Sequence, residues 1–373
     1  MATILNFAQV YNAIKAVGHK RTILVEGDAG SGKTSLLYAL QRDPAFANYH
    51  VIPPVDCMQL SDGSIAMMDL DRERGVSFEL PNARFGVSKQ NQKGVKGSKP
   101  IIVGFDEIAK PRQFVKDMLA PVILERRIGS MYLPTGSIVC GFTNLSLEGL
   151  GDSLQAHMRD RLLVVRMRKP TADEWVLWAA DNNIDAAIMA AAKQYPNIFE
   201  SFTDYLPGGK AAGKDLKREN PYILNPKDGM QDKCVTPRGL EAASDVLHAS
   251  QGFDEATLTA LLEGTLGRAF TGKLMSYIRF GSELPAFSRV CDEPDTCPPP
   301  KNPTAQLVQV FQFVTLVQNV DQAEAVSVYV TRLREEMQSL FVNTVANSKR
   351  NANFLQAATF TALLAKVRQY FGN

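Results

Sequence analysis

The stretch Gly27-Asp28-Ala29-Gly30-Ser31-Gly32-Lys33-Thr34 matches the pattern G-x-x-x-x-G-K-[ST] at every fixed position. A β-branched run at 21–26 precedes it and predicts a buried strand, and a predicted helix begins at Ser35. In this setting the glycines let backbone N–H groups surround the α- and β-phosphates of a nucleotide. Lys33 then reaches the β- and γ-phosphates, and the Thr34 hydroxyl is a Mg²⁺ ligand. Residues 27–35 are therefore predicted to bind a nucleoside triphosphate.

Two further strands carry polar residues at their ends. The hydrophobic run 101–105 ends in Asp106 and Glu107, and the run 136–142 is followed by Asn144. In P-loop enzymes the acid at the first of these tips holds Mg²⁺, which assigns that role to Asp106. Glu107, one residue further on, is the predicted general base, and Asn144 is predicted to hydrogen-bond the attacking water or the γ-phosphate.

Composition sets the class of protein. With 373 residues, 45% hydrophobic and 21% charged, the chain is typical of a globular protein with two or three packed units. No apolar run reaches the roughly 18 residues that a membrane span needs, and the N-terminus lacks the basic flank of a signal peptide, so a cytoplasmic location is expected. The formal net charge of +2 means that nucleic-acid binding would require a local basic patch.

The five cysteines form no disulfide framework that the sequence can identify, because their number is odd and they are scattered. Cys291 and Cys297 are separated by five residues, but no further ligands stand at zinc spacing. The sequence therefore predicts neither a disulfide-stabilised fold nor a zinc site.

The order of the motifs resembles that of AAA+ ATPases, and within them the MoxR-like ATPases of the helix-2-insert clade. A phage or mobile-element member of this clade also fits the resemblance. The resemblance covers roughly residues 5–250. Three segments support it: an amphipathic helix, an insert hairpin at 62–81 and a β-hairpin at 125–134. The helix presents Phe7, Val10, Ile14 and Val17. The resemblance implies an α/β fold, namely a P-loop NTPase core of three αβα layers with a parallel sheet, followed by an all-α lid.

The resemblance also assigns two arginines. After the stretch 149–154, Arg161 matches the arginine finger that reaches the neighbouring subunit's ATP, with Arg159 as the alternative. Arg238 follows Thr236 and Pro237, an N-cap and a first helical residue, and matches the sensor arginine of the lid. Whether Arg238 acts on its own subunit's nucleotide or on a neighbour's stays open.

These expectations divide the chain into four parts. Residues 1–167 are the predicted AAA+ core, 168–283 the helical lid, 284–303 a proline-rich linker and 304–373 a C-terminal helical segment. The resemblance does not extend to the last part, so its role is open.

The resemblance implies a ring of identical subunits, expected to be a hexamer, that uses ATP and Mg²⁺ to remodel a protein client. Proteins of this clade often act with a von Willebrand factor A-type partner. The alternative is a DNA-binding or DNA-translocating motor of a phage or mobile element. Four lysines in a segment that we expect to be a flexible loop indicate it: Lys89, Lys93, Lys96 and Lys99. That segment lacks aromatic residues, which argues against base stacking, and a solvated loop without a partner is the other interpretation. A non-enzymatic scaffold is a third hypothesis, against which the intact set of motif residues argues.

Overall fold

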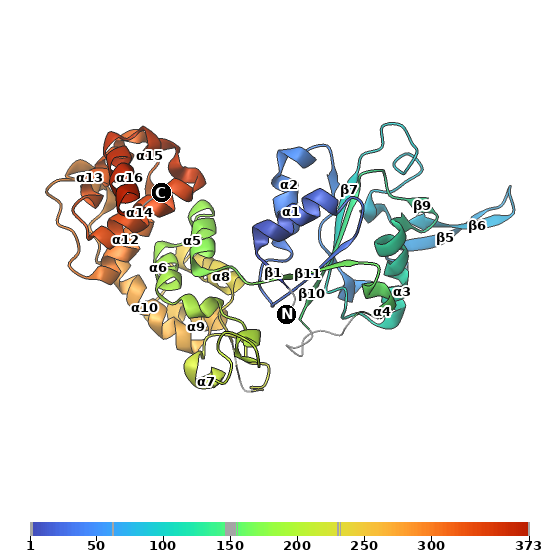
Figure 1. Ribbon diagram of the computed structural model, residues 1–373, viewed down its shortest axis with the longest axis horizontal. Helices are drawn as coiled ribbons and strands as arrows, with labels where there is room; N and C mark the ends of the chain where they lie inside the picture. The colour runs from blue at the N-terminus through green and yellow to red at the C-terminus, as the bar shows by residue number, and fades with distance from the viewer. Residues whose placement is uncertain are drawn as a thin grey trace. The chain divides into compact units, whose positions relative to one another are not determined.

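The computed structural model describes residues 3–61, 63–145, 154, 156–229, 231 and 233–371. The chain divides after Lys169 into two compact units (Figure 1). The first unit contains the strands β1 (Ile4–Leu5), β2 (Ile23–Gly27), β3 (His50–Val51), β4 (Val55–Asp56), β5 (Ala66–Asp71), β6 (Val76–Pro81), β7 (Ile101–Asp106), β8 (Arg127–Ile128), β9 (Met131–Tyr132), β10 (Ile138–Asn144) and β11 (Leu163–Met167). Its α-helices are α1 (Phe7–Val17), α2 (Ser35–Arg42), α3 (Gln113–Ala120) and α4 (Ala156–Arg159).

The central sheet of the first unit has the order β1-β11-β2-β10-β7-β3, and β4 also pairs with β7. Every one of these pairings is parallel. Asn144 at the end of β10 pairs with Gly27 at the end of β2. The carboxyl ends of β2, β7 and β10 therefore meet at one edge of the sheet, from which the phosphate loop begins.

The two faces of the sheet bury different helices. Ile23 and Val25 of β2 pack in one hydrophobic cluster with residues of α1 and α2, whereas Leu24 belongs to a second cluster with residues of α3. This alternation follows from the two-residue period of a strand. The predicted fold class is confirmed: a three-layer αβα P-loop core is followed by a helical C-terminal part.

Helix α1 begins at a capping box in which the Asn6 side chain accepts from the Gln9 N–H and the Gln9 side chain accepts from the Asn6 N–H. Val10 and Ile14 are fully buried, as the predicted amphipathic face requires. Phe7 and Val17, the other two members of that face, are 38% and 36% exposed. Of the four predicted positions only Val10 and Ile14 belong to the buried cluster, against which Tyr11 and Ala13 of the same helix also pack.

Both predicted hairpins form. Strands β5 and β6 pair antiparallel from Ala66 with Pro81 to Asp71 with Val76, and this hairpin extends away from the central sheet (Figure 1). Strands β8 and β9 make a shorter hairpin closed by Gly129 and Ser130.

The second unit is helical over its described residues. Its helices are α5 (Ala172–Asp181), α6 (Ala186–Gln194), α7 (Leu216–Glu219), α8 (Pro237–His248), α9 (Glu255–Leu266), α10 (Arg268–Ser282), α11 (Phe287–Asp292), α12 (Pro303–Leu316), α13 (Val320–Val330), α14 (Glu335–Asn347), α15 (Ala352–Gln356) and α16 (Ala358–Phe371). None of the helices in the described ranges is both long enough and apolar enough to cross a membrane.

The segment 284–303 differs from the predicted linker. It contains α11, and Val290 and Cys297 are completely buried in the hydrophobic cluster that also includes Ile188 of α6 and Phe311 of α12. Residues 304–373 therefore share one core with the preceding helices. The prolines mark turns between packed helices, as Pro303 does at the first position of α12, and a proline-rich composition alone cannot distinguish such turns from a linker.

Candidate nucleotide-binding and hydrolysis site

The phosphate loop turns at two glycines with positive φ, Gly30 at 70° and Gly32 at 88°. Lys33 follows and is buried, with 7% of its surface exposed. Its Nζ donates to the carbonyl oxygens of Gly27 at 3.0 Å and Asp28 at 2.7 Å, and to Oδ1 of Asn144 at 2.8 Å. The predicted lysine thus connects the loop to the end of β10.

A hydroxyl and a carboxylate meet beside the loop. Thr34 Oγ1 donates to Asp106 Oδ2 at 2.7 Å, and the other carboxylate oxygen of Asp106 accepts from the Glu107 N–H at 3.0 Å. Hard oxygen donors of this kind are the protein ligands of Mg²⁺ in P-loop sites, where the ion keeps several waters. In the loop itself, Ser31 Oγ is buried without a hydrogen-bond partner among the described residues. The donor set and this orphaned hydroxyl fit a Mg²⁺–nucleotide ligand.

Glu107 lies at the centre of the polar residues that follow the strands. Its Oε1 accepts from Asn144 Nδ2 at 2.9 Å, so Asn144 bridges Glu107 and Lys33. Its Oε2 lies 3.0 Å from Lys110 Nζ, an ion pair whose geometry makes no hydrogen bond. That oxygen is buried and retains its capacity to accept a proton or a hydrogen bond.

The turn after β7 aims Glu107 at β10. Glu107 has a left-handed backbone with φ 52°, which costs a residue with a side chain about 1–2 kcal/mol. The conformation is held by the next residue, since the Ile108 N–H donates to the Phe142 carbonyl at 3.0 Å and the Ile108 side chain is buried. Strain of this type clusters at functional sites.

A buried thiol stands behind the two carboxylates. Cys57 directly follows β4, whose Asp56 pairs in register with Asp106. Burial raises the pKa of the Cys57 thiol above its usual range, and the Asp106 carboxylate adds to the effect. The thiol is therefore protonated at neutral pH and is not a nucleophile.

The two finger candidates have different surroundings. Arg159 at the end of α4 pairs with Glu26, its Nη1 lying 2.5 Å from Glu26 Oε1 in the same subunit. Arg161 is exposed in the turn before β11 and forms no ion pair with any described residue. Buried Met158 and Leu162 anchor the turn to the sheet. Of the preceding stretch 149–154, only Leu154 lies within the described residues.

Arg238 is the second residue of α8 and is exposed. As predicted, Thr236 caps this helix, its Oγ1 accepting from the Gly239 N–H at 3.0 Å. Arg238 belongs to the second unit, so its role toward the nucleotide stays a prediction.

Two residues of the site were missed by the sequence motifs. Lys110 contacts Glu107 from three residues further along the chain, and its charge next to the Asp-Glu pair is the only signal that could have indicated it. Glu26 ends the predicted strand as an ordinary polar residue, and its partner Arg159 is distant in sequence. No local pattern indicates that pair.

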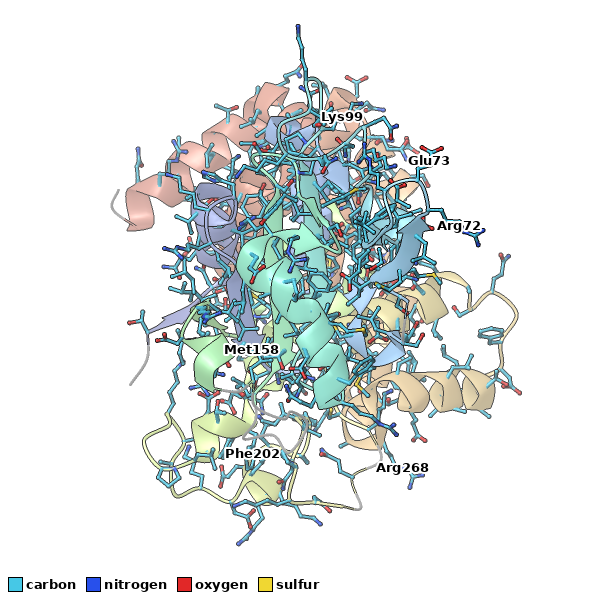
Figure 2. The ribbon with its side chains drawn as sticks, turned by 90° about the vertical axis from the view of Figure 1, so that its right-hand side faces the viewer. Arg72, Glu73, Lys99, Met158, Phe202 and Arg268 are labelled. Atoms are coloured by element: carbon cyan, nitrogen blue, oxygen red, sulfur yellow. The ribbon has the colours of Figure 1, made fainter. Side chains whose placement is uncertain are left out.

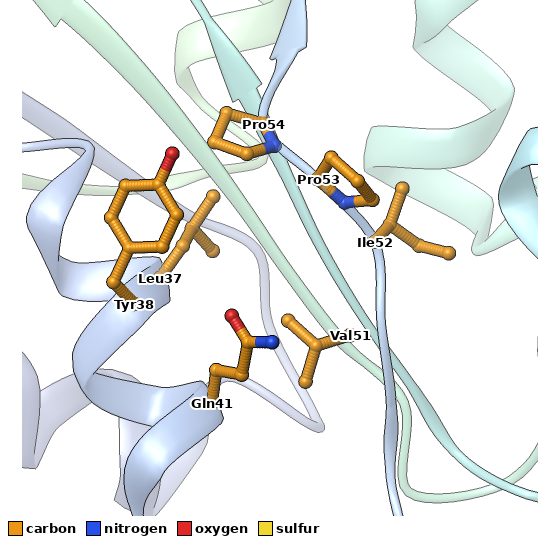
Figure 3. A pocket seen from close by; sticks show the side chains of 7 residues that line it. All are labelled: Leu37, Tyr38, Gln41, Val51, Ile52, Pro53 and Pro54. Atoms are coloured by element: carbon orange, nitrogen blue, oxygen red, sulfur yellow. The ribbon is translucent and has the colours of Figure 1, made fainter.

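A pocket of about 120 Å³ lies between α2 and the segment after β3 (Figure 3). The side chains that line it are Leu37, Tyr38, Gln41, Val51, Ile52, Pro53 and Pro54. It includes none of the predicted catalytic residues, and its lining is mostly apolar. The residues predicted for hydrolysis contact one another at the sheet edge, outside this pocket.

No protein-family model and no curated protein matches the chain. Among solved structures, a point mutant of RuvB from Thermotoga maritima is similar with 15% identity and a TM-score of 0.36, covering 77% of this chain and 74% of that one. NtrX from Brucella abortus in complex with ADP gives 14% identity and a TM-score of 0.39, with 99% and 69% covered. A putative ATPase from Cytophaga hutchinsonii gives 12% identity and a TM-score of 0.31, with 73% and 88% covered. At these TM-scores the similarities assign neither a family nor an activity to the chain.

Proposed function

We propose that the chain is a Mg²⁺-dependent ATP hydrolase of the AAA+ class. The observation that carries the proposal is the continuous polar chain Lys33–Asn144–Glu107, which runs beside the Thr34–Asp106 contact at the carboxyl edge of the sheet. A loop that only bound phosphate would not need a carboxylate held in a strained turn and oriented by an amide.

Each residue has a distinct role in this proposal. The backbone of residues 27–35 and the Lys33 ammonium bind the phosphates of the substrate. Thr34 and Asp106 would hold Mg²⁺, which supplies neutralisation of phosphate charge when bound. Glu107 accepts the proton of the attacking water at a carboxylate oxygen, and Asn144 orients Glu107 through Oε1. Lys33 leaves its carbonyl contacts to meet the γ-phosphate, so its bond to Asn144 links phosphate binding to the base.

We further propose that the hydrolase works as a ring, with Arg161 supplied to the neighbouring subunit's nucleotide. The support is that Arg161 is exposed and unpaired among the described residues, whereas Arg159 is engaged within its own subunit. In the family that the sequence resembles, such rings are hexamers that remodel a protein client, in some cases a von Willebrand factor A-type partner. We propose a protein client here, to be captured on a Glu107→Gln variant that holds ATP.

The decisive experiment compares Glu107→Gln with wild type for binding of a fluorescent ATP analogue and for phosphate release. Binding should be retained within a few-fold, and turnover should fall by roughly a hundredfold or more because the water loses its base. Glu73→Gln, the same change at the exposed tip of the β5–β6 hairpin, is the matched control and should leave both unchanged. Near-normal phosphate release by Glu107→Gln would exclude Glu107 as the base.

A further inference from the structure

Residues 82–100, here named the lysine platform, contain five cationic residues and no Asp or Glu. All five cations are exposed, and among the described residues none forms an ion pair: Arg84, Lys89, Lys93, Lys96 and Lys99. On a chain with a net charge of +2, this segment concentrates positive charge and contains no acidic residue of its own, while the neighbouring hairpin places the exposed Asp69 in register with Phe78. Lys99, labelled in Figure 2, is one of these exposed cations.

The backbone of the lysine platform is folded on itself, in contrast to the flexible loop expected from its composition. The Asn91 side chain connects the two ends of the platform: its Nδ2 donates to the Gly86 carbonyl at 2.7 Å, and its Oδ1 accepts from the Lys99 N–H at 2.7 Å. Phe85 and Val87 are buried and attach the platform to the core. Cations displayed from an ordered backbone lose less conformational entropy when they bind a ligand.

Two aromatic rings from other segments lie beside the lysines. Lys89 Nζ is 5.6 Å from the centre of the Phe78 ring on β6, and Lys93 Nζ is 5.9 Å from that of Tyr132 on β9. The Lys93 N–H also donates to the Tyr132 carbonyl at 3.2 Å, and Tyr132 is 49% exposed. The stretch from Lys89 to Lys99 contains no aromatic residue, so the two rings beside its lysines come from β6 and β9.

The two hairpins that carry these rings are joined by their backbones. The Ser130 N–H donates to the Glu79 carbonyl at 2.9 Å, and the Glu79 N–H donates to Ser130 Oγ at 3.0 Å. Gly129 permits this approach, because a Cβ there would lie 2.6 Å from the Glu79 carbonyl oxygen. Phe78, Tyr132 and the lysine platform therefore lie on segments that contact one another, and together they make up the candidate binding surface.

We propose that this surface binds single-stranded nucleic acid. The lysines would contact backbone phosphates, and unpaired bases would stack against the half-exposed Tyr132 and the partly exposed Phe78. Proteins that bind single-stranded nucleic acid combine cationic side chains for the phosphates with aromatic rings for the bases. An acidic polypeptide has no bases to stack on these rings, so the rings favour nucleic acid. The surface shares no residue with the nucleotide site, so the inference goes beyond the proposed hydrolase and does not depend on it.

The test uses the full chain and fluorescent oligo(dT), with anisotropy measured from about 50 mM to about 200 mM salt, where the salt dependence of phosphate binding is resolved. Changing Lys89, Lys93, Lys96 and Lys99 together to Gln should weaken binding at least about tenfold and lower the log–log salt slope by about 0.7 for each phosphate that is no longer neutralised. Tyr132→Ala should weaken binding by roughly tenfold because base stacking is removed, and Tyr132→Phe should retain it. ATP hydrolysis by all of these variants should stay near the wild-type rate.

A matched control carries the same reduction of charge elsewhere: Lys210, Lys214, Lys233 and Lys301 of the second unit, all exposed, changed together to Gln. This control should bind oligo(dT) as wild type does.

The proposal is overturned if wild type does not bind at the lowest salt, or if the control loses as much affinity as the platform variant. It is also overturned if poly-glutamate competes as well as oligo(dT) and Tyr132→Ala has no effect, which would assign the surface to acidic polypeptide. Equal binding of duplex DNA with no effect of Tyr132→Ala would likewise exclude the single-strand assignment. The conservative pair at Tyr132 keeps the test valid should the fourfold variant misfold.

Discussion

Lysines serve opposite purposes in two regions of the first unit. At the sheet edge, Lys33 is buried and its ammonium donates to two carbonyl oxygens and an amide oxygen, of which the carbonyls would be exchanged for phosphate when a nucleotide binds. On the lysine platform, cations such as Lys96 are exposed and lack an ion-pair partner among the described residues. A buried cation must be satisfied by the protein, since burying it unpaired is very costly, whereas an exposed one is satisfied by water and can exchange water for a ligand. The surroundings of each lysine therefore decide its chemistry.

The same substitution in the two regions gives the largest expected contrast. Lys33→Ala removes the phosphate contact and leaves the Asn144 Oδ1 acceptor without its donor, so ATP binding should weaken by roughly a hundredfold or more. Lys96→Ala should leave ATP binding unchanged. Isothermal titration with ATP and Mg²⁺ measures both affinities, and equal values for the two variants would show that Lys33 does not contact the nucleotide.

The two arginines differ in the same way, because Arg159 pairs with Glu26 of its own subunit and Arg161 forms no ion pair with any described residue. Inactive Arg161→Ala mixed with inactive Glu107→Gln should regain partial ATPase activity, because some interfaces then combine an intact Glu107 with a neighbour's intact Arg161. Arg159→Ala mixed with Glu107→Gln should regain nothing, since the Arg159–Glu26 pair lies within the subunit that carries the intact base. Steady-state phosphate release from the mixtures measures this, and rescue of Arg159→Ala instead of Arg161→Ala would reverse the assignment of the finger.

A smaller effect tests the contact between the β5–β6 and β8–β9 hairpins, which carry Phe78 and Tyr132. Gly129→Ala and Gly94→Ala both place a side chain at positive φ, at 55° and 89°, which costs about 1–2 kcal/mol. Only Gly129 faces backbone within contact distance, whereas nothing lies within 4 Å of a Cβ at Gly94. Gly129→Ala should therefore lower the free energy of unfolding by about 1–3 kcal/mol more than Gly94→Ala, as overpacking does. Urea denaturation of both variants measures the difference, and equal losses would show that the junction is loose.

Much of the fold, and the meeting of the candidate site residues at one sheet edge, could be predicted because the signals are local. The phosphate loop, the Asp106-Glu107 strand end and the Thr236 cap each lie within a few residues, where backbone preference and side-chain type act directly. Parallel strands then bring their carboxyl ends to one edge of the sheet, which explains why Asn144 lies beside Glu107.

The sequence by itself thus determined the fold class, the loop and the residues at the strand ends, whereas only the tertiary structure decided which groups they contact. Glu26 and Arg159 are 133 residues apart, and no periodicity or motif encodes such a pair. Tyr132 meets Lys93, and Val290 enters the helical core, for the same reason. Contacts between distant segments depend on the packing of the whole unit, because the gain from burial and hydrogen bonding must exceed the entropy of closing long loops, and that balance is not written in any short stretch of residues.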